Sequence, residues 1–465
     1  MVPVPKLFRN TATVRRINAY MESAFSEVLH TTLNPDGPGV IRVHLIPPKK
    51  EEGVLNPSIA IINGTDIVPV NFAWAVMLAE MIRETNRYDG REIGEEDIRH
   101  ILDESARNVK RIIPVFSKKR IETDIRTIYR TLRQIAYREE VTTDVHYMSI
   151  GEYADCMSAP HRMDLMVSAM TKNGKWACNQ KCVHCYAADQ IHAGEEELPT
   201  EAWKEILDRC RAAGIPQVTF TGGEPTMRED LIELIRYARW FVSRLNTNGV
   251  KLTREYCRAL HEAELDSVQI TFYSRDKAIH EQLVGAAHFD ETAAGIENAL
   301  AEGLSLSVNT PLCTLNRDYL STLAYLHEKG VLYVTCSGLI TTGNAVGEAS
   351  EKLQLSGEEL EGILREAVAF CHENGMEIAF TSPGWIDQSV FDELNIPSPS
   401  CGACLSNMAV TPGGNVVPCQ SWLSDKPLGN ILKDDWRTIW ESEACSSRRD
   451  ASAEMTGECP LRRFC

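Results

Sequence analysis

Three cysteines within one short loop constrain this chain more than any other stretch. They are Cys178, Cys182 and Cys185, in the spacing C-x3-C-x2-C, and His184 directly precedes the last of them. Thiolates so close in sequence converge on one metal centre, and an all-sulfur set suits an iron–sulfur cluster or zinc. A [4Fe–4S] cube held by three thiolates keeps one iron free for another ligand, whereas structural zinc takes four protein ligands. With His184 as a fourth ligand, the loop taken alone also fits zinc.

Composition and charge narrow the classes of partner. The chain has 465 residues, which predicts two or three domains, and it carries 15 cysteines and a formal net charge of −17. Negative charge opposes binding to a nucleic-acid backbone, so no nucleic-acid partner is expected. There is no long apolar run and no secretion signal pattern, so no membrane partner is expected either. Many cysteines without an export signal indicate reduced thiols and metal ligation, and hence a cytoplasmic protein.

From about residue 162 the chain alternates short apolar runs with helical segments. Strands are predicted at 165–169, 217–220, 241–245, 267–272, 305–309 and 331–335. Each is followed by a helical segment, and this alternation predicts an α/β fold with parallel strands. In such folds the loops at the carboxyl ends of the strands form the site. One further strand is predicted at 376–380, before a cysteine-rich tail punctuated by glycine and proline.

The first 140 residues or so carry a different pattern. The predicted elements are a weak helix before residue 28, strands at 40–46, 59–62 and 67–70, and helices at 72–84, after Gly94 and at 118–139. Asn63-Gly64 lies between two apolar runs, which predicts a hairpin with a type I′ turn. The last of these helices is expected to link the region to the rest of the chain.

The segment Gly222-Gly223-Glu224 comes directly after the second predicted strand of the alternating region. Two glycines let a backbone approach a ligand closely. The carboxylate of Glu224 can accept hydrogen bonds from an ammonium group. Alone, this short segment is weak evidence, but it follows the three-cysteine loop by only one strand.

Together, the loop and this segment resemble the radical S-adenosylmethionine (SAM) enzymes, over residues 160–465. The resemblance implies an open, partial (β/α)6 barrel and a [4Fe–4S] cluster on the three cysteines. It implies that SAM binds the free iron and is cleaved to a 5′-deoxyadenosyl radical, which abstracts a substrate hydrogen. Beyond the cluster loop, it assigns no catalytic residue.

The same resemblance places eight residues against SAM: Tyr186, Gly222, Gly223, Glu224, Asn246, Asn248, Thr271 and Asn309. In relatives, Ser-Leu-Asp-Gly often stands where this chain has Thr271-Phe-Tyr-Ser274, so only the hydroxyl of the first position is kept. For the asparagines, and for the loop 339–345 that would pass the adenine, ordinary polar turns remain the alternative.

The C-terminal tail carries a second cysteine pattern. Cys401 and Cys404 are followed by Gly414 and Cys419, in a C-x9-G-x4-C frame counted from Cys404. This resembles the SPASM or twitch extension of radical SAM enzymes, which binds auxiliary [4Fe–4S] clusters. The implied ligands are Cys401, Cys404 and Cys419, completed by Cys459 or Cys465. With Cys445 the tail holds six cysteines, fewer than the eight that two cubes need, so at least one auxiliary cluster is expected, with zinc as the alternative.

The N-terminal strands and helices resemble the small winged-helix domain that recognises leader peptides, which adds a peptide as an extra strand to an open sheet edge. A purely structural cap is the alternative. The expected divisions are 1–116 for leader recognition, 117–160 for a helical linker, 161–380 for the barrel and 381–465 for the SPASM/twitch domain.

The combined resemblance implies an oxidoreductase that forms a thioether or carbon–carbon crosslink in a ribosomally made precursor peptide. Its expected partners are that peptide with its leader and an external one-electron reductant of the flavodoxin or ferredoxin type. Two alternatives stay open. One is a maturase of a protein side chain or a small-molecule dehydrogenase, and the other is a non-catalytic iron–sulfur electron carrier.

Overall fold

The computed structural model describes residues 12–33, 40–51, 54–55, 57–88, 93–347 and 351–453. The chain divides into two compact units, Met1–Ala159 with Cys210–Pro216, and Pro160–Arg209 with Gln217–Cys465. Each is described by itself. Among the described residues, no helix combines the length and the apolar character needed to cross a membrane.

The N-terminal unit contains a four-stranded antiparallel sheet in the order β1-β2-β5-β6. Its strands are β1 Leu29–Leu33, β2 Ile41–Ile46, β5 Ser58–Ile62 and β6 Asp66–Val70, and a small separate pair is formed by β3 Lys50–Glu51 and β4 Val54–Leu55. The predicted turn is confirmed, since Asn63 and Gly64 have φ of 50° and 74° and Thr65 N–H donates to the Ile62 carbonyl. Strand β1 was not predicted.

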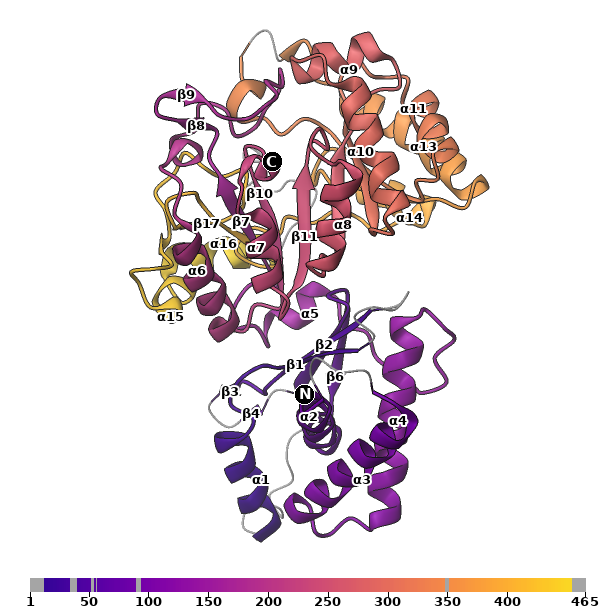
Figure 1. Cartoon of the computed structure of the whole chain (residues 1–465), viewed down its shortest axis with the longest axis vertical. Helices are drawn as coiled ribbons and strands as arrows, with labels where there is room; N and C mark the ends of the chain where they lie inside the picture. The colour runs from indigo at the N-terminus through magenta and orange to yellow at the C-terminus, as the bar shows by residue number, and fades with distance from the viewer. Residues whose placement is uncertain are drawn as a thin grey trace. The chain divides into compact units, whose positions relative to one another are not determined.

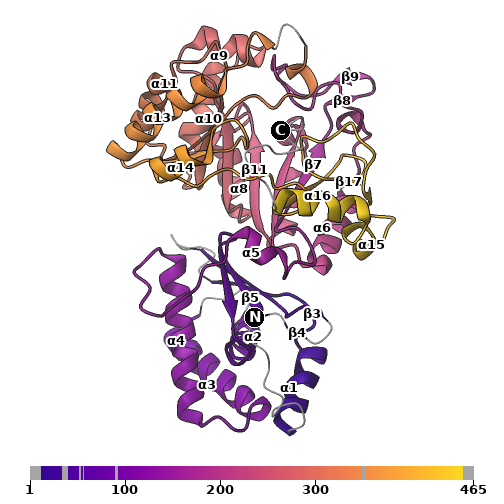
Figure 2. The same ribbon diagram turned by 180° about the vertical axis from the view of Figure 1, so that it is seen from behind.

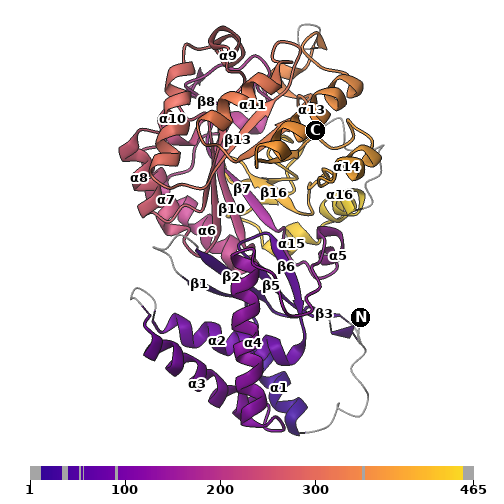
Figure 3. The same ribbon diagram turned by 90° about the vertical axis from the view of Figure 1, so that its right-hand side faces the viewer.

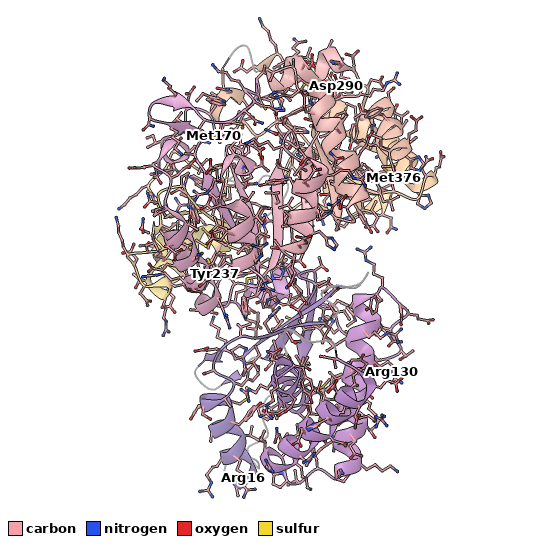
Figure 4. All side chains as sticks on the ribbon, in the orientation of Figure 1. Arg16, Arg130, Met170, Tyr237, Asp290 and Met376 are labelled. Atoms are coloured by element: carbon pink, nitrogen blue, oxygen red, sulfur yellow. The ribbon has the colours of Figure 1, made fainter. Side chains whose placement is uncertain are left out.

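Five helices of the described N-terminal unit accompany this sheet: α1 Ala12–Ser23, α2 Phe72–Asn86, α3 Glu95–Ile112, α4 Lys118–Ala136 and α5 Ile150–Ala154. Helix α4, predicted as a link, packs into the same core as α2, because Ile121, Ile125 and Ile128 recur on one buried face. Figure 3 shows α4 beside the helices of this unit. Arg130, labelled in Figure 4, lies on the exposed side of α4.

The second unit is built on a ten-stranded sheet in the order β15-β14-β13-β12-β11-β10-β7-β16-β17-β18. Its strands are β7 Arg162–Ser168, β10 Gln217–Gly222, β11 Val242–Thr247, β12 Ser267–Thr271, β13 Leu306–Pro311, β14 Tyr333–Ser337, β15 Glu377–Phe380, β16 Asn407–Val410, β17 Asn415–Val417 and β18 Gly429–Asn430. From β7 to β15 all pairings are parallel, which confirms the predicted α/β alternation. The strand predicted at 376–380 joins this sheet as β15.

The other described elements of this unit are α6 Thr200–Ala213, α7 Leu231–Tyr237, α8 Arg254–Glu262, α9 Lys277–Val284, α10 Phe289–Ala301, α11 Tyr319–Glu328, α13 Gly357–Glu373, α14 Gln388–Leu394, α15 Trp436–Trp440, α16 Glu443–Ala453, three 3-10 turns (η2 Ile191–Gly194, η3 Pro225–Met227, η4 Gly343–Ala345) and the pair β8 Thr171–Lys172 and β9 Lys175–Trp176. Helices α8 and α10 pack together on the outer face of the parallel sheet (Figure 1). Helix α9 was not predicted.

The cysteine-rich tail continues the barrel sheet. Strand β16 pairs in parallel with β7, with Asn407 opposite Arg162, and β17 then turns back antiparallel to β16. Figure 3 shows β16 next to β7, and in Figure 2 helices α15 and α16 lie near β17. The tail is therefore joined to the barrel by main-chain hydrogen bonds as well as by side-chain packing.

Helix α10 supports the loop after β11 through a glycine contact. A Cβ at Gly295 would lie 2.3 Å from the Gly249 carbonyl oxygen, whereas a Cβ at Gly362 in α13 would meet nothing within 4 Å. Thr292, one turn before Gly295, donates its hydroxyl to the Asn248 carbonyl over 3.1 Å. The position of this strand-end loop therefore depends on a bare backbone in α10.

We expect Gly295→Ala and Gly362→Ala to have opposite effects on stability. Both replace a helical glycine by alanine, which alone stabilises a helix by about 0.5–1 kcal/mol. At Gly295 the contact with the Gly249 carbonyl adds an overpacking cost of about 1–3 kcal/mol. Thermal unfolding should therefore show a lower midpoint for Gly295→Ala and an equal or higher one for Gly362→Ala. Equal shifts would contradict the packing argument.

Candidate active site and iron–sulfur centres

Two glycines bring the end of β10 against the end of β7. Gly222 has a φ of +130°, and a Cβ there would lie 2.2 Å from the Ser168 carbonyl oxygen. Gly223 donates its N–H to the same oxygen over 2.9 Å. The β10–β7 register shifts at Gly222, a β-bulge of the kind that redirects a chain near an active site. A larger residue at either position would displace the segment that carries Glu224.

The cysteine loop is anchored at both ends by its main chain. Lys181 N–H donates to the Val284 carbonyl at the end of α9, and Asn344 N–H donates to the Cys185 carbonyl, both over 2.9 Å. A Cβ at Gly343 would lie 2.5 Å from that Cys185 oxygen. The loop 339–345, predicted to lie beside SAM, therefore packs directly against the backbone of the cysteine loop.

The three thiols of this loop interact with one another and are largely removed from water. The Cys178 Sγ lies 3.4 Å from the Gly223 carbonyl oxygen, so the loop touches the Gly-Gly-Glu segment. Burial raises the pKa of Cys178 to about 12, and burial and the other two thiols raise the pKa of Cys182. Burial also raises the pKa of Cys185. Metal binding replaces thiol protons, so a half-buried group of three thiols with raised pKa values fits a cluster and is costly to ionise without one.

His184 lies inside the protein as a neutral ring. It is 7% exposed, burial lowers its pKa to about 4, and among the described residues neither ring nitrogen has a hydrogen-bond partner. Its ring meets Tyr273 edge-on, with centroids 5.0 Å apart. The partners of its ring are therefore apolar and aromatic contacts, and across the described residues no group of three His, Cys, Asp or Glu side chains is arranged closely enough to hold a single metal ion.

Glu224 is fixed at the start of η3 by four hydrogen bonds. Its Oε1 accepts from the Thr226 N–H (3.0 Å) and from the hydroxyls of Thr226 (2.6 Å) and Thr247 (2.7 Å). Its Oε2 accepts the Asn248 N–H over 2.8 Å and has no other donor among the described residues. Burial raises the pKa of Glu224, and these hydrogen bonds oppose that rise. Oε2 thus retains a lone pair that can accept a bond from a ligand ammonium group.

Asn248 links this carboxylate to the cysteine loop. Its Nδ2 donates to the Asn179 Oδ1 over 2.7 Å, and Asn179 follows Cys178 directly. Its Oδ1 accepts the Val250 N–H over 3.1 Å. The structure therefore brings together Glu224, Asn248 and the first cysteine, three groups that come from different strand-end loops.

Asn246, Thr271 and Asn309 lie on the adjacent strands β11, β12 and β13, and Thr271 is directly opposite Asn309. The Asn309 Oδ1 accepts the Thr335 hydroxyl over 2.7 Å. The Asn246 Oδ1 is buried without a hydrogen-bond partner in the described residues. An unpaired buried acceptor costs about 1–3 kcal/mol, so this oxygen fits a site where a ligand or water supplies the donor. Contact of these three residues with SAM stays a prediction.

Tyr186 belongs to the core between the two cysteine regions. Burial raises the pKa of its hydroxyl, and the interaction with Thr221 opposes that rise. It packs in an apolar cluster with Met170, which follows β7 and is labelled in Figure 4, and with Leu423 from the tail. The structure shows the ring of Tyr186 packed against this core. Its contact with SAM stays a prediction.

The structure brings Cys401, Cys404 and Cys419 together in the tail. The chain turns between β16 and β17 at Gly414, which has a φ of +86°, and Cys404 N–H donates to the Pro418 carbonyl over 3.2 Å. Electrostatic interactions couple Cys419 to Cys401 and Cys404 to Cys419. The other two predicted ligands, Cys459 and Cys465, lie outside the described residues.

Cys445 was not among the predicted ligands, yet its thiol lies against that of Cys404. The two thiols interact electrostatically, and this interaction together with the Arg449 guanidinium lowers the pKa of Cys445. Cys445 belongs to no short spacing motif, so only the count of six tail cysteines pointed towards it.

Comparisons with known proteins identify both regions. Residues 177–326 match the family model described as the radical SAM superfamily, and residues 401–462 match SPASM, an iron–sulfur cluster-binding domain. The fold is similar to the crystal structure of Streptococcus suis SuiB bound to the precursor peptide SuiA, with a TM-score of 0.57 and 14% identity over 88% of this chain and 91% of that one. At this identity the likeness concerns the fold.

Two curated relatives match in sequence. The chain is 32% identical to the Fe-coproporphyrin III synthase of Methanosarcina barkeri over 206 residues, which are 43% of this chain and 51% of the relative. It is 27% identical to the PqqA peptide cyclase of Streptomyces rochei over 272 residues, 57% of this chain and 72% of the relative. The chain thus spans about half the length of the first and under three quarters of the second.

The geometry places the cysteine loop beside a buried carboxylate at the strand ends of a partial barrel. The matches then give the family of each part: residues 177–326 form a radical SAM domain, and residues 401–462 form a SPASM iron–sulfur domain. The cofactors of the protein are accordingly SAM, a [4Fe–4S] cluster and an auxiliary iron–sulfur cluster. The alternative of a non-catalytic electron carrier is set aside by these matches.

Replacing Cys178, Cys182 and Cys185 together by alanine should remove one cube and leave the other. We expect the anaerobically reconstituted protein to fall from about eight irons per chain to about four, as counted by iron analysis. A folded variant that has lost all of its iron would contradict a separate auxiliary site.

Glu224→Gln should weaken SAM binding by about ten- to a hundredfold, because a charge-assisted hydrogen bond is worth about 1.5–3 kcal/mol. Equilibrium dialysis of labelled SAM against the reconstituted enzyme measures this. The matched control is Glu229→Gln, since Glu229 is an exposed carboxylate five residues away. Equal affinities in the two variants would remove Glu224 from the SAM site.

Proposed function

We propose that this enzyme is a cytoplasmic maturase that forms a thioether or carbon–carbon crosslink in a ribosomally made precursor peptide. Residues 1–116 recognise the leader together with part of 117–160, which was expected only to link the domains but contributes α4 and the segment after it to the cavity. Residues 161–380 form the SAM barrel and 381–465 the auxiliary domain. The observation that carries the proposal is an apolar cavity at the sheet edge of the N-terminal unit. The solved SuiB complex with a precursor peptide and the PqqA peptide cyclase support the substrate class.

The cavity lies beside β6, an edge strand of the described sheet, and has a volume of about 290 Å³. Its walls come from β6, from α2 and α4, and from the segment after α4, and they include Val68, Trp74, Leu132 and Val145. An extended peptide lying along β6 would direct alternate side chains to one face, so an apolar leader side chain fits this cavity.

The edge beside the cavity is only partly available for main-chain pairing. The Ile67 carbonyl already accepts the Met148 N–H over 2.8 Å, and Pro69 has no N–H to donate. Affinity for a leader therefore depends more on the apolar cavity than on a full ladder of strand hydrogen bonds.

In the barrel, each residue has a proposed task. Glu224 and Asn248 hold and orient the amino-acid end of SAM, and Gly222 and Gly223 let the backbone approach it. When bound and reduced, the cluster and SAM supply a carbon radical that takes a hydrogen atom from the substrate. A crosslink removes a second hydrogen as a proton and leaves one electron, which an auxiliary cluster held by the tail cysteines would accept. The first electron comes from an external reductant of the flavodoxin or ferredoxin type.

A second candidate is a reaction on a small molecule of the tetrapyrrole class. The observation in its favour is the higher sequence identity to the Fe-coproporphyrin III synthase, 32% against 27% for the peptide cyclase. The two candidates differ in what the N-terminal cavity does, because a tetrapyrrole enzyme needs no peptide there.

The test is an anaerobic capture of peptides from the host lysate on the immobilised full-length enzyme, read by mass spectrometry. We expect one short precursor, which then loses the mass of two hydrogen atoms per crosslink when incubated with SAM and reductant. Leu132→Gln should reduce its capture by about tenfold or more, since burial of an apolar side chain contributes about 1.5–3 kcal/mol.

Arg130→Gln is the matched control, because Arg130 is exposed on the same helix. SAM cleavage should be equal in both variants. Failure to retain any peptide while SAM is still cleaved would contradict the maturase proposal, as would equal capture by Leu132→Gln and Arg130→Gln.

A further inference from the structure

Helix α16 holds Cys445 in its first turn. The Cys445 N–H donates to the carbonyl (3.0 Å) and the hydroxyl (3.2 Å) of Ser442, just before the helix begins. The side chain is fully buried, and its thiol interacts electrostatically with that of Cys404. The first turn of a helix has a positive electrostatic end that stabilises a thiolate.

The other end of α16 contacts the same cysteine loop. The Ser452 hydroxyl donates to the Ala403 carbonyl over 2.8 Å and lies 3.7 Å from the Cys401 Sγ. Since both ends of the helix are tied to residues 401–404, Cys445 is held next to the predicted ligands by contacts from two sides. The position of Cys445 next to Cys404 is therefore fixed by the packing of the whole helix and not by one contact.

A cation also lies beside the Cys445 sulfur. The Arg449 guanidinium lies 3.7 Å from it and is fixed over the Trp440 ring at 4.0 Å and by a bond to the Trp440 carbonyl. Hydrogen bonds to ligand sulfurs tune iron–sulfur clusters, so a cationic donor at this sulfur fits a metal-bound thiolate. By contrast, the thiol of Cys210 is affected only by burial, with no charged group of the described residues beside it.

We propose that Cys445 is the fourth ligand of the auxiliary cluster and completes a four-thiolate site with Cys401, Cys404 and Cys419. Four thiolates satisfy the four irons of a [4Fe–4S] cube, so this cluster has no iron open to substrate. Its role is then to accept or pass electrons, while the substrate is positioned by protein side chains. The inference rests on the SPASM region alone and holds for a peptide or a small-molecule substrate.

The test uses full-length protein in which Cys178, Cys182 and Cys185 are already alanine, so that all remaining iron is auxiliary. Adding Cys445→Ala should lower the count clearly below about four irons per chain and remove the [4Fe–4S] signal in Mössbauer spectra. Adding Cys459→Ala, Cys465→Ala or the buried control Cys257→Ala should leave both unchanged. An intact cube in the Cys445 variant, or its loss in the Cys459 or Cys465 variant, would overturn the assignment.

A second measurement covers the case in which Cys445→Ala does not fold. In the same three-alanine background, Arg449→Gln should shift the reduction potential of the auxiliary cluster to a more negative value, because a cation near a ligand sulfur stabilises the reduced cluster. Arg437→Gln removes an equal charge from an exposed residue paired with Glu441 and should leave the potential unchanged. Equal potentials in the two variants would overturn the assignment.

Discussion

The cysteine loop is held by contacts with glycines, at positions where any side chain would collide with the main chain of the loop. A Cβ at Gly285 would lie 2.4 Å from the Lys181 carbonyl oxygen, and one at Gly343 would lie 2.4 Å from that of Tyr186. The end of helix α9 and the loop after β14 therefore both contact the main chain of the cysteine loop at glycines. These contacts hold the main chain of the loop, so its three thiol groups are not needed to fix the loop against the barrel.

The two iron–sulfur regions share one core. The apolar cluster around Met166 and Met170 contacts Cys178 and Cys185 and also includes Leu423 of the tail. Its packing fixes the spacing between the two regions because both are attached to β7, one through the loop that follows it and the other through β16. An electron passing between them would cross a well-packed interior, not a mobile interface.

The parallel strands and the cysteine loop could be predicted because their signals are local: apolar periodicity and short spacings. Strand β1 was missed because Leu29–Leu33 follows a helical pattern, although its two threonines favour a strand. Helix α9 has only eight residues, and its ends are set by the Asp276 cap and the left-handed Gly285. The contact of Cys445 with Cys404 depends on how α16 packs, which no spacing in the sequence encodes.

The pairing of β16 with β7 also affects how the chain folds. Strand β7 begins at Arg162, but β16, which pairs with its outer edge, begins only at Asn407. During synthesis this edge therefore stays unpaired until most of the chain has been made. Contacts so distant in sequence form slowly, and an unpaired apolar strand edge is prone to pair with another chain. Folding of this enzyme should therefore be most vulnerable to aggregation before β16 is made, and a truncation before Asn407 would leave that edge unpaired.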